Sequence, residues 1–277
     1  MHIIKCPVCG GGMEIIKNIC KCTQGHCFDV GAKGYLNLLL PNQGSGNHGD
    51  NREMLLARRS FLEKGYYQNL SEHINQLCLS LLPKKPDTVI ADCCCGEGYY
   101  TKKLCRFLIG NDIHTNIFAF DISKAGVKMA SSKTLPVQFL VASVFNIPLA
   151  DESIDTAVHS FAPYCNNEIS RILKPGGYLI GILPGKRHLY GMKEILYESP
   201  YENDETGYES ETLTLVDTVY VKGKIHLKSQ EDIHNLFLMT PYFFRTTREG
   251  AEKLTRLNTL ETETEFVIKI LQKCTVS

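Results

Sequence analysis

Apolar residues between positions 54 and 62 recur with helical spacing. Met54, Leu55, Ala57, Phe61 and Leu62, with Arg58 among them, follow the i, i+3, i+4, i+7 pattern that is typical of an amphipathic helix. A glycine at position 65 ends this predicted helix. A second helix is predicted over about residues 70–82, because the proline at position 83 cannot continue it.

The pattern then changes to short apolar runs that alternate with helical segments. Strands are predicted over residues 88–92, 117–121, 138–142, 154–160 and 177–183, with helices over 99–108, 124–132 and 167–173. Strands that alternate with helices predict an α/β fold with a doubly wound parallel sheet. The tail is expected to add antiparallel strands over 213–222 and 224–228, a helix over 229–237 and a last strand over 265–271.

The composition agrees with a globular protein. The chain has 277 residues, 43% of them hydrophobic and 22% charged, which suffices for one large domain, or one domain with a small appendage. Its best apolar run, Tyr178 to Leu183, is far shorter than the ~18–20 residues of a membrane span, so we expect no membrane insertion. No signal-peptide pattern opens the chain, and a cytoplasmic, reducing location is expected despite 12 cysteines.

The charge is balanced overall but unevenly distributed. Thirty basic and 30 acidic residues give a formal charge of zero, which excludes a globally basic nucleic-acid coat. Residues 1–86 hold ten basic and six acidic residues, a net charge of +4, so the remaining residues carry −4. Such polarity would let one end of the molecule face a polyanion.

Cysteines are concentrated at the N-terminus, where five of them fall within the first 27 residues. This density indicates a separate small module, and the Gly/Asn-rich stretch 41–50 that follows is predicted to be a loop. Too small to bury a core unaided, such a module would depend on a metal for its fold.

The spacing C-x2-C-x12-C-x3-H within this module predicts a zinc site formed by Cys6, Cys9, Cys22 and His26. Cys20 is an alternative to Cys22, but the Cys22 and His26 pair is favoured because one tight knuckle or one helical turn spans it. Buried reduced thiols without a metal are a second alternative, and a redox C-x-x-C motif is a third. The redox motif is disfavoured because the Gly-Gly-Gly that follows it opens no helix. Four protein ligands indicate a structural zinc rather than a catalytic one.

Three strand ends indicate a nucleoside cofactor. Asp92 ends the first predicted strand, and Gly96-Glu97-Gly98 follows as a turn into a helix. A threonine where the dinucleotide fingerprint needs a third small residue disfavours a pyrophosphate cradle. Asp121 ends the next strand, where a carboxylate can accept both ribose hydroxyls, and Ser143 follows the third, near an adenine edge. Together these ends predict an S-adenosylmethionine site in a class I methyltransferase fold, with ordinary turns in a Rossmann-like sheet as the alternative.

The same motifs resemble one protein family over nearly the whole chain. The 23S rRNA guanine-N1 methyltransferases are similar in the zinc pattern and in the order and spacing of Phe28-Asp29-Val30, Gly49-Asp50, Glu53-Met54, Ala57-Arg58, Phe61-Leu62, Gly65-Tyr66-Tyr67, Cys95-Gly96-Glu97-Gly98-Tyr99-Tyr100, Leu173-Lys174-Pro175-Gly176-Gly177, Pro184-Gly185, His188-Leu189 and Met239-Thr240-Pro241. One departure is Cys94, which stands where the family has a glycine and would crowd the methionine part of the cofactor.

The resemblance implies a zinc-binding RNA-recognition module over residues 1–40, a helical connecting segment over 41–86 and a methyltransferase domain with C-terminal strands over 87–277. It also implies a substrate guanine in a 23S rRNA hairpin and a homodimer that frames an RNA cleft. Tyr67 and His188 match family positions that contact the cofactor. Glu97 is either a helix N-terminal charge favoured by the helix dipole or a partner of the cationic end of the cofactor.

Several functional questions stay open at the level of sequence. The base that removes the N1 proton is not assigned, with His159, Glu168 and solvent as candidates. Arg52, Arg58, Arg59 and Lys64 either contact RNA phosphate or form a solvated helix face. Two alternative functions are a small-molecule methyltransferase with a structural zinc module, and a non-catalytic RNA-binding factor in which Cys94 has disabled cofactor binding.

Overall fold

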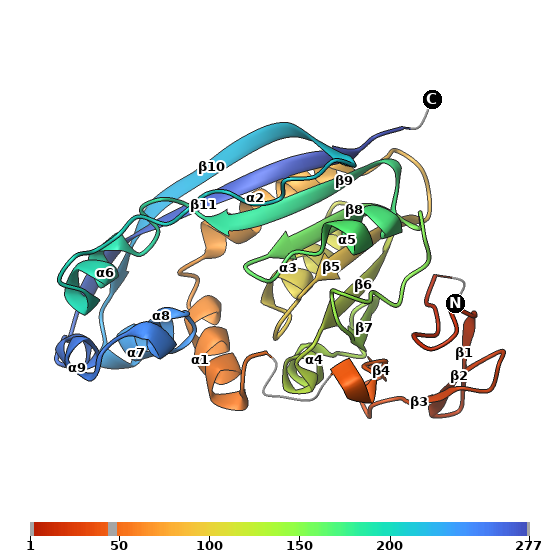
Figure 1. Ribbon diagram of the computed structural model, residues 1–277, viewed down its shortest axis with the longest axis horizontal. Helices are drawn as coiled ribbons and strands as arrows, with labels where there is room; N and C mark the ends of the chain where they lie inside the picture. Colours follow the sequence, from red (N-terminus) through yellow and green to blue (C-terminus); the bar gives the residue numbers. More distant parts are fainter. Residues whose placement is uncertain (1–2, 44–48, 276–277) are drawn as a thin grey trace.

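One eight-stranded sheet organises the computed structural model, which describes residues 3–43 and 49–275 (Figure 1). The sheet contains strands β4 (Leu36–Asn37), β5 (Thr88–Cys93), β6 (Thr115–Asp121), β7 (Val137–Val141), β8 (Ile154–Ser160), β9 (Leu173–Pro184), β10 (Leu213–Leu227) and β11 (Leu260–Lys273). A separate three-stranded sheet at the N-terminus is formed by β1 (Met13–Ile16), β2 (Ile19–Cys22) and β3 (Cys27–Asp29).

The helices that connect these strands are α1 (Arg52–Glu63), α2 (Gln68–Leu81), α3 (Tyr99–Gly110), α4 (Lys124–Ala130), α5 (Asn166–Ile172), α6 (Tyr190–Leu196), α7 (Gln230–Leu238), α8 (Tyr242–Arg245) and α9 (Arg248–Thr255), with a short 3-10 helix η1 (Pro41–Gln43). Local signals set their ends. The Asn51 side chain accepts the N–H of Met54 at the start of α1, and Ser123 accepts the N–H of Gly126 at the start of α4. No helix of the described residues is long and apolar enough to cross a membrane.

The strand order in the large sheet is β10-β11-β9-β8-β5-β6-β7-β4. Strands β4 to β9 run parallel to one another, whereas β11 is antiparallel to both β9 and β10. Central strand β5 is buried at every position, as expected for a parallel strand that is covered on both faces. The predicted doubly wound α/β sheet is therefore confirmed.

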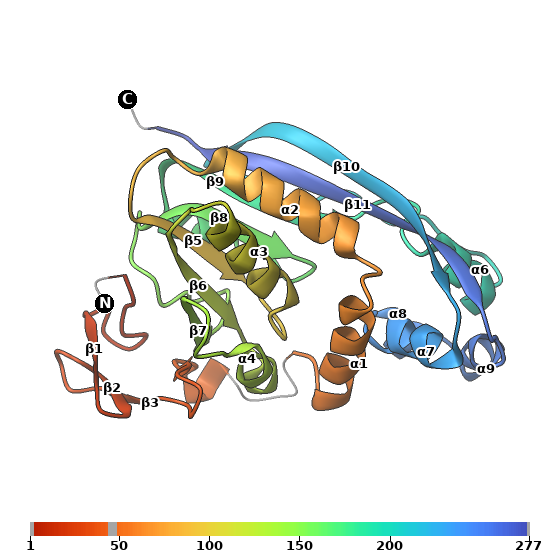
Figure 2. The same cartoon turned by 180° about the vertical axis from the view of Figure 1, so that it is seen from behind.

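Helices α2 and α3 cover one face of the sheet, and α5 lies on the other (Figures 1 and 2). Leu70 and Ile74 of α2 and Leu104 of α3 pack with Ile90 of β5 in one buried cluster. These residues lie on the faces that the helical spacing of apolar residues predicts to be buried. Helix α3 begins at the predicted residue, and the other ends of α2 and α3 differ from the predicted ones by one or two residues.

The C-terminal part differs from the sequence-based expectation. The two strands predicted over 213–222 and 224–228 are one continuous strand, β10, in which Gly223 pairs with Thr264 of β11. The glycine does not interrupt the strand because the ladder with β11 continues on both sides of it. Strand β11 begins at Leu260 rather than at 265, and helices α6 to α9 lie near the far end of the β10–β11 hairpin (Figure 1).

The N-terminal module is joined to the edge of the large sheet. Strand β4 pairs in parallel with β7, and Ile4 forms an isolated bridge with Leu149. Ile4, Leu36 and Leu38 are almost fully buried in a cluster that they share with the strands of the large sheet. Of the loop predicted over 41–50, residues 41–43 form η1, and residues 44–48 lie outside the described part.

Candidate metal centre and cofactor site

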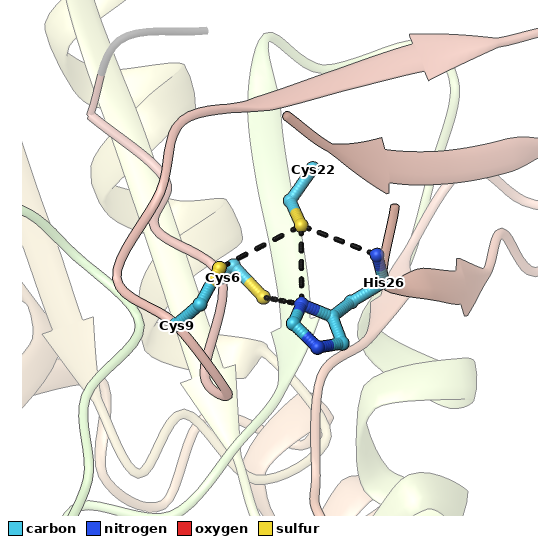
Figure 3. A group of neighbouring side chains, drawn as sticks. All are labelled: Cys6, Cys9, Cys22 and His26. Atoms are coloured by element: carbon cyan, nitrogen blue, oxygen red, sulfur yellow. Dashed lines mark hydrogen bonds between the residues drawn. The ribbon is translucent and has the colours of Figure 1, made fainter. Parts of the chain in front are cut away.

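The four predicted zinc ligands lie together in the N-terminal module (Figure 3). The ligand atoms of Cys6, Cys9, Cys22 and His26 all lie within 4.8 Å of one another. The sulfurs of Cys9 and Cys22 are 3.7 Å apart, and His26 Nδ1 lies 3.3 Å from the sulfur of Cys22 and 3.7 Å from that of Cys6. Donors around a tetrahedral zinc with ligand distances of ~2.0–2.3 Å lie about 3.3–3.8 Å apart, so this group fits the ion.

Backbone geometry prepares these side chains for a metal. Cys22 ends β2, and its Sγ accepts the N–H of His26 at 3.3 Å, while the Cys22 N–H donates to the His26 carbonyl. Desolvation raises the pKa of the Cys22 thiol, but the hydrogen bonds from His26 and Gln24 outweigh it and lower the pKa to about 6. The thiolate that zinc requires is therefore accessible at neutral pH. Cys20 is buried outside this group, which excludes it as the replacement for Cys22.

The candidate cofactor site lies where β5, β6 and β7 end. Asp121, at the end of β6, accepts the N–H of Gly96 at 2.9 Å and that of Ser123 at 2.8 Å. Asp92, near the end of β5, accepts a hydrogen bond from the Thr101 hydroxyl. Ser143 follows β7 and accepts the N–H of Phe145. The structure thus brings the acidic residues and the glycine turn of the sequence-based site to one edge of the sheet.

The turn between β5 and α3 requires glycine at position 98. Gly98 has a φ of +83°, and a Cβ there would lie 2.7 Å from the Cβ of Ala130. Cys94 also has a positive φ, +68°, where the family has a glycine. A side chain in this conformation costs roughly 1–2 kcal/mol, so Cys94 introduces strain into the turn.

Burial raises the pKa of both carboxyl groups at this site. Desolvation raises the pKa of Asp92 to about 6, and it also raises the pKa of Asp121. Buried carboxylates need hydrogen-bond donors or positive charge beside them. The ribose hydroxyls and the ammonium group of S-adenosylmethionine provide such partners, so the residues present fit that cofactor.

A second group of predicted residues lies together beside β11. Tyr67 and His188 are both buried, with Tyr67 Oη 3.2 Å from His188 Nε2. His188 Nδ1 accepts the N–H of Glu265, so its Nε2 carries the proton that it donates to Tyr67. Desolvation, assisted by the charge of Lys193, lowers the pKa of His188 to about 3, which keeps the ring neutral.

Helix α1 contributes two arginines whose orientation the sequence did not reveal. Arg59 Nε lies 3.3 Å from a carboxylate oxygen of Glu97, and Arg59 Nη2 donates to the carbonyl of Met129. Arg58 forms an ion pair with Asp50, and its Nη1 lies 3.4 Å from the position of a Cβ on Gly96. Both arginines are therefore turned onto the glycine loop, unlike the exposed Arg52. The available signal was the place of Arg58 among the apolar residues of the buried helix face.

Two known family models match two separate parts of the chain. Residues 91–181 match the model of a methyltransferase domain, and residues 4–45 match that of the RlmA N-terminal zinc ribbon. The fold and the site thus define a class I S-adenosylmethionine-dependent methyltransferase with an N-terminal zinc-binding module.

Three curated relatives specify the family. The chain is 28% identical to YxjB of Bacillus subtilis, provisionally named a 23S rRNA (guanine-N1)-methyltransferase, over 98% of this chain and 97% of the relative. It is 29% identical to the 23S rRNA (guanine(748)-N1)-methyltransferase of Streptomyces fradiae, over 71% and 68%, respectively. A Micromonospora griseorubida protein with a similar provisional name is 30% identical over 67% of each chain. The chain belongs to this family.

We predict that Cys9→Ser removes the metal. Elemental analysis should give about one zinc per chain in the wild type and almost none in the variant. Because the three-stranded sheet has little core of its own, loss of the metal should increase proteolysis within the first ~40 residues, while the large sheet stays folded. A wild-type protein that contains no zinc and resists chelators would contradict the assignment.

Proposed function

We propose that this protein transfers the methyl group of S-adenosylmethionine to N1 of a guanine in a hairpin of 23S rRNA. One observation carries the proposal: the Cys3His module is joined to the edge of a methyltransferase sheet. In agreement with it, YxjB, whose provisional name states this activity, aligns over almost the full length of both chains. A substrate of this kind places the protein in the cytoplasm.

We further propose that the cofactor is held by residues at the ends of β5, β6 and β7, in the β9–α6 connection and in the α1–α2 connection. Asp121 would accept the ribose hydroxyls, and the loop between β5 and α3 would enclose the methionine part. Glu97 accepts the N–H of Tyr99 and pairs with Arg59, which supports a role in fixing this loop. The complete proposed set is Tyr67, Asp92, Gly96, Glu97, Gly98, Asp121, Ser143 and His188.

The bound cofactor supplies an electrophilic methyl group, and the chain must bring a deprotonated guanine N1 in line with it. Of the three candidate bases, His159 is occupied at both nitrogens, by Tyr208 and by the Pro163 carbonyl. Glu168 is bound to Arg171 and to the N–H of Ile147. Because both side chains already have structural partners, loss of the proton to solvent is the favoured route.

Arg58 extends the proposed cofactor site. Its guanidinium has five N–H donors, and its ion pair with Asp50 engages Nη1. The positive charge acts on Asp121 and Tyr67, since it lowers pKa values that desolvation raises. The guanidinium of Arg58 could therefore bind the carboxylate group in the methionine part of the cofactor.

We predict that Arg58→Gln weakens binding of S-adenosylhomocysteine about tenfold or more, the worth of a charge-assisted hydrogen bond. Binding of 5′-methylthioadenosine, which lacks the amino acid, should change less than about twofold. Calorimetry with both ligands measures the difference, and Arg52→Gln on the same helix is the matched control. Equal losses for both ligands would refute the role in carboxylate binding. Failure of the wild type to bind S-adenosylhomocysteine would favour the non-catalytic alternative.

The reaction itself is tested with an in-vitro transcript of 23S rRNA, which carries no methyl groups. Incubation with labelled S-adenosylmethionine and digestion to nucleosides should give labelled 1-methylguanosine. A label found only in another nucleoside would disprove the proposed position. No transfer to RNA by a protein that binds the cofactor would favour the small-molecule alternative.

We propose that the zinc module recognises RNA. The module, residues 1–40, holds four basic and two acidic residues, a net charge of +2, and β4 joins it to the β7 edge of the sheet. The Cys9→Ser variant should therefore lose more affinity for the transcript than for S-adenosylhomocysteine, and wild-type RNA affinity should fall as salt rises. Equal losses on removal of zinc would indicate that the module instead supports the cofactor site.

We also propose a homodimer. Strand β10 forms one edge of the sheet and exposes Leu215, Val216 and Tyr220. An exposed apolar edge strand is a ready surface for pairing with a second chain. Light scattering should give twice the 31.1 kDa chain mass, and Val216→Lys should shift it toward the monomer. A monomeric wild type would contradict the proposal.

A further inference from the structure

Phe161 combines two features that each cost stability. Its side chain is 45% exposed, although it is large and apolar. Its backbone has a φ of +53°, in the left-handed region that side chains rarely adopt. Among the exposed aromatic residues that the structure describes, Phe161 alone has this conformation. Strain of this kind persists where the surrounding structure enforces it, and it is concentrated at functional sites.

The position of Phe161 follows from the strand register. It comes directly after β8, whose neighbours in the sheet are β5 and β9. His159 pairs with Cys93, so the chain after β8 runs beside the glycine turn that follows β5. The Phe161 N–H donates to the carbonyl of Ile182 on β9 at 3.3 Å. Phe161 therefore lies at the carboxyl edge of the sheet, where ligands of such folds bind.

The ring of Phe161 lies next to the proposed cofactor residues. Its centroid is 5.9 Å from that of Phe266. The Phe266 ring in turn lies 4.9 Å from Tyr67 and 4.6 Å from His188. An exposed aromatic ring thus borders the group formed by Tyr67 and His188.

A buried network fixes the segment that carries Phe161. His159 donates from Nε2 to the Pro163 carbonyl at 3.1 Å, and its Nδ1 accepts the hydroxyl of Tyr208 at 2.7 Å. Desolvation lowers the pKa of His159, which keeps this ring neutral and the pattern of donors fixed. Tyr164 packs against both His159 and Tyr208. The chain on both sides of Phe161 is therefore held in place.

We propose that the ring of Phe161 is the surface on which the target guanine stacks during methyl transfer. This inference rests on the proposed RNA methyltransferase function. An enzyme that modifies a base atom must take the base out of its stack, and aromatic side chains then replace the lost stacking. Phe161 is exposed, rigidly held and adjacent to the cofactor residues, as such a surface must be. Phe145, although more exposed, follows β7 and lies on the other side of β6 from the Tyr67 and His188 group.

Phe161→Gly separates stacking from a structural role. Glycine adopts the left-handed conformation without strain, so the melting temperature of the variant should equal or exceed that of the wild type. A base stacked on an aromatic ring is worth roughly 1–3 kcal/mol, so kcat on the 23S rRNA transcript should fall about 10- to 100-fold. Affinity for the transcript should change less than about threefold, because phosphate contacts dominate it. Affinity for S-adenosylhomocysteine should be unchanged.

Two further substitutions form a matched pair. Phe161→Tyr retains a ring and should restore kcat to within about threefold of the wild type, whereas Phe161→Leu retains apolar volume without a ring and should behave like Phe161→Gly. Wild-type kcat in Phe161→Gly or Phe161→Leu would overturn the inference while leaving the proposed function intact. A lower melting temperature with weaker cofactor binding in Phe161→Gly would also overturn it, in favour of a packing role. Absence of 1-methylguanosine with the wild type would overturn both.

Discussion

The parallel pairing of β5 with β6 on one side and β8 on the other is the constraint on which the rest of the structure depends. Parallel strands end at one edge, so residues that follow different strands meet there although they are far apart in the sequence. This places Asp92, Asp121 and Phe161 at the same edge of the sheet. Burial of β5 on both faces removes water from the same place, which raises the pKa of Asp92 and lets hydrogen bonds from backbone N–H groups fix Asp121.

Elements from both ends of the chain pack close to this edge of the sheet. Helix α1 places Arg58 and Arg59 on the glycine loop, and α1 is itself packed against α7 from the C-terminal part. Strand β4 carries the zinc module onto β7, next to the strand that ends in Asp121. The metal centre and the cofactor site are separate in chemistry, but one sheet positions both.

The sequence predicted most of the central fold because its signals are local. Asp92, the glycines at positions 96 and 98 and Asp121 follow apolar strands directly, and those strands formed as expected. The zinc ligands were predictable for the same reason, since metal geometry restricts their spacing. The continuous strand β10 was predicted as two strands, because a glycine such as Gly223 weakens an isolated strand. In the structure, pairing with β11 on both sides of Gly223 keeps the strand continuous.

The sequence by itself determined the strand and helix pattern of the central sheet, the four metal ligands and the acidic residues of the cofactor edge, since each depends on residues close together in the chain or on a periodic pattern. The helical spacing placed Arg58 on the apolar face of its helix, but only the tertiary structure decided that this face meets the glycine loop, and that both nitrogens of His159 have structural partners. The tertiary structure also decided that the backbone of Phe161 adopts the left-handed conformation. These properties arise from contacts between elements that are distant in sequence, and no local pattern encodes which side chain a neighbouring strand or helix will bring into place.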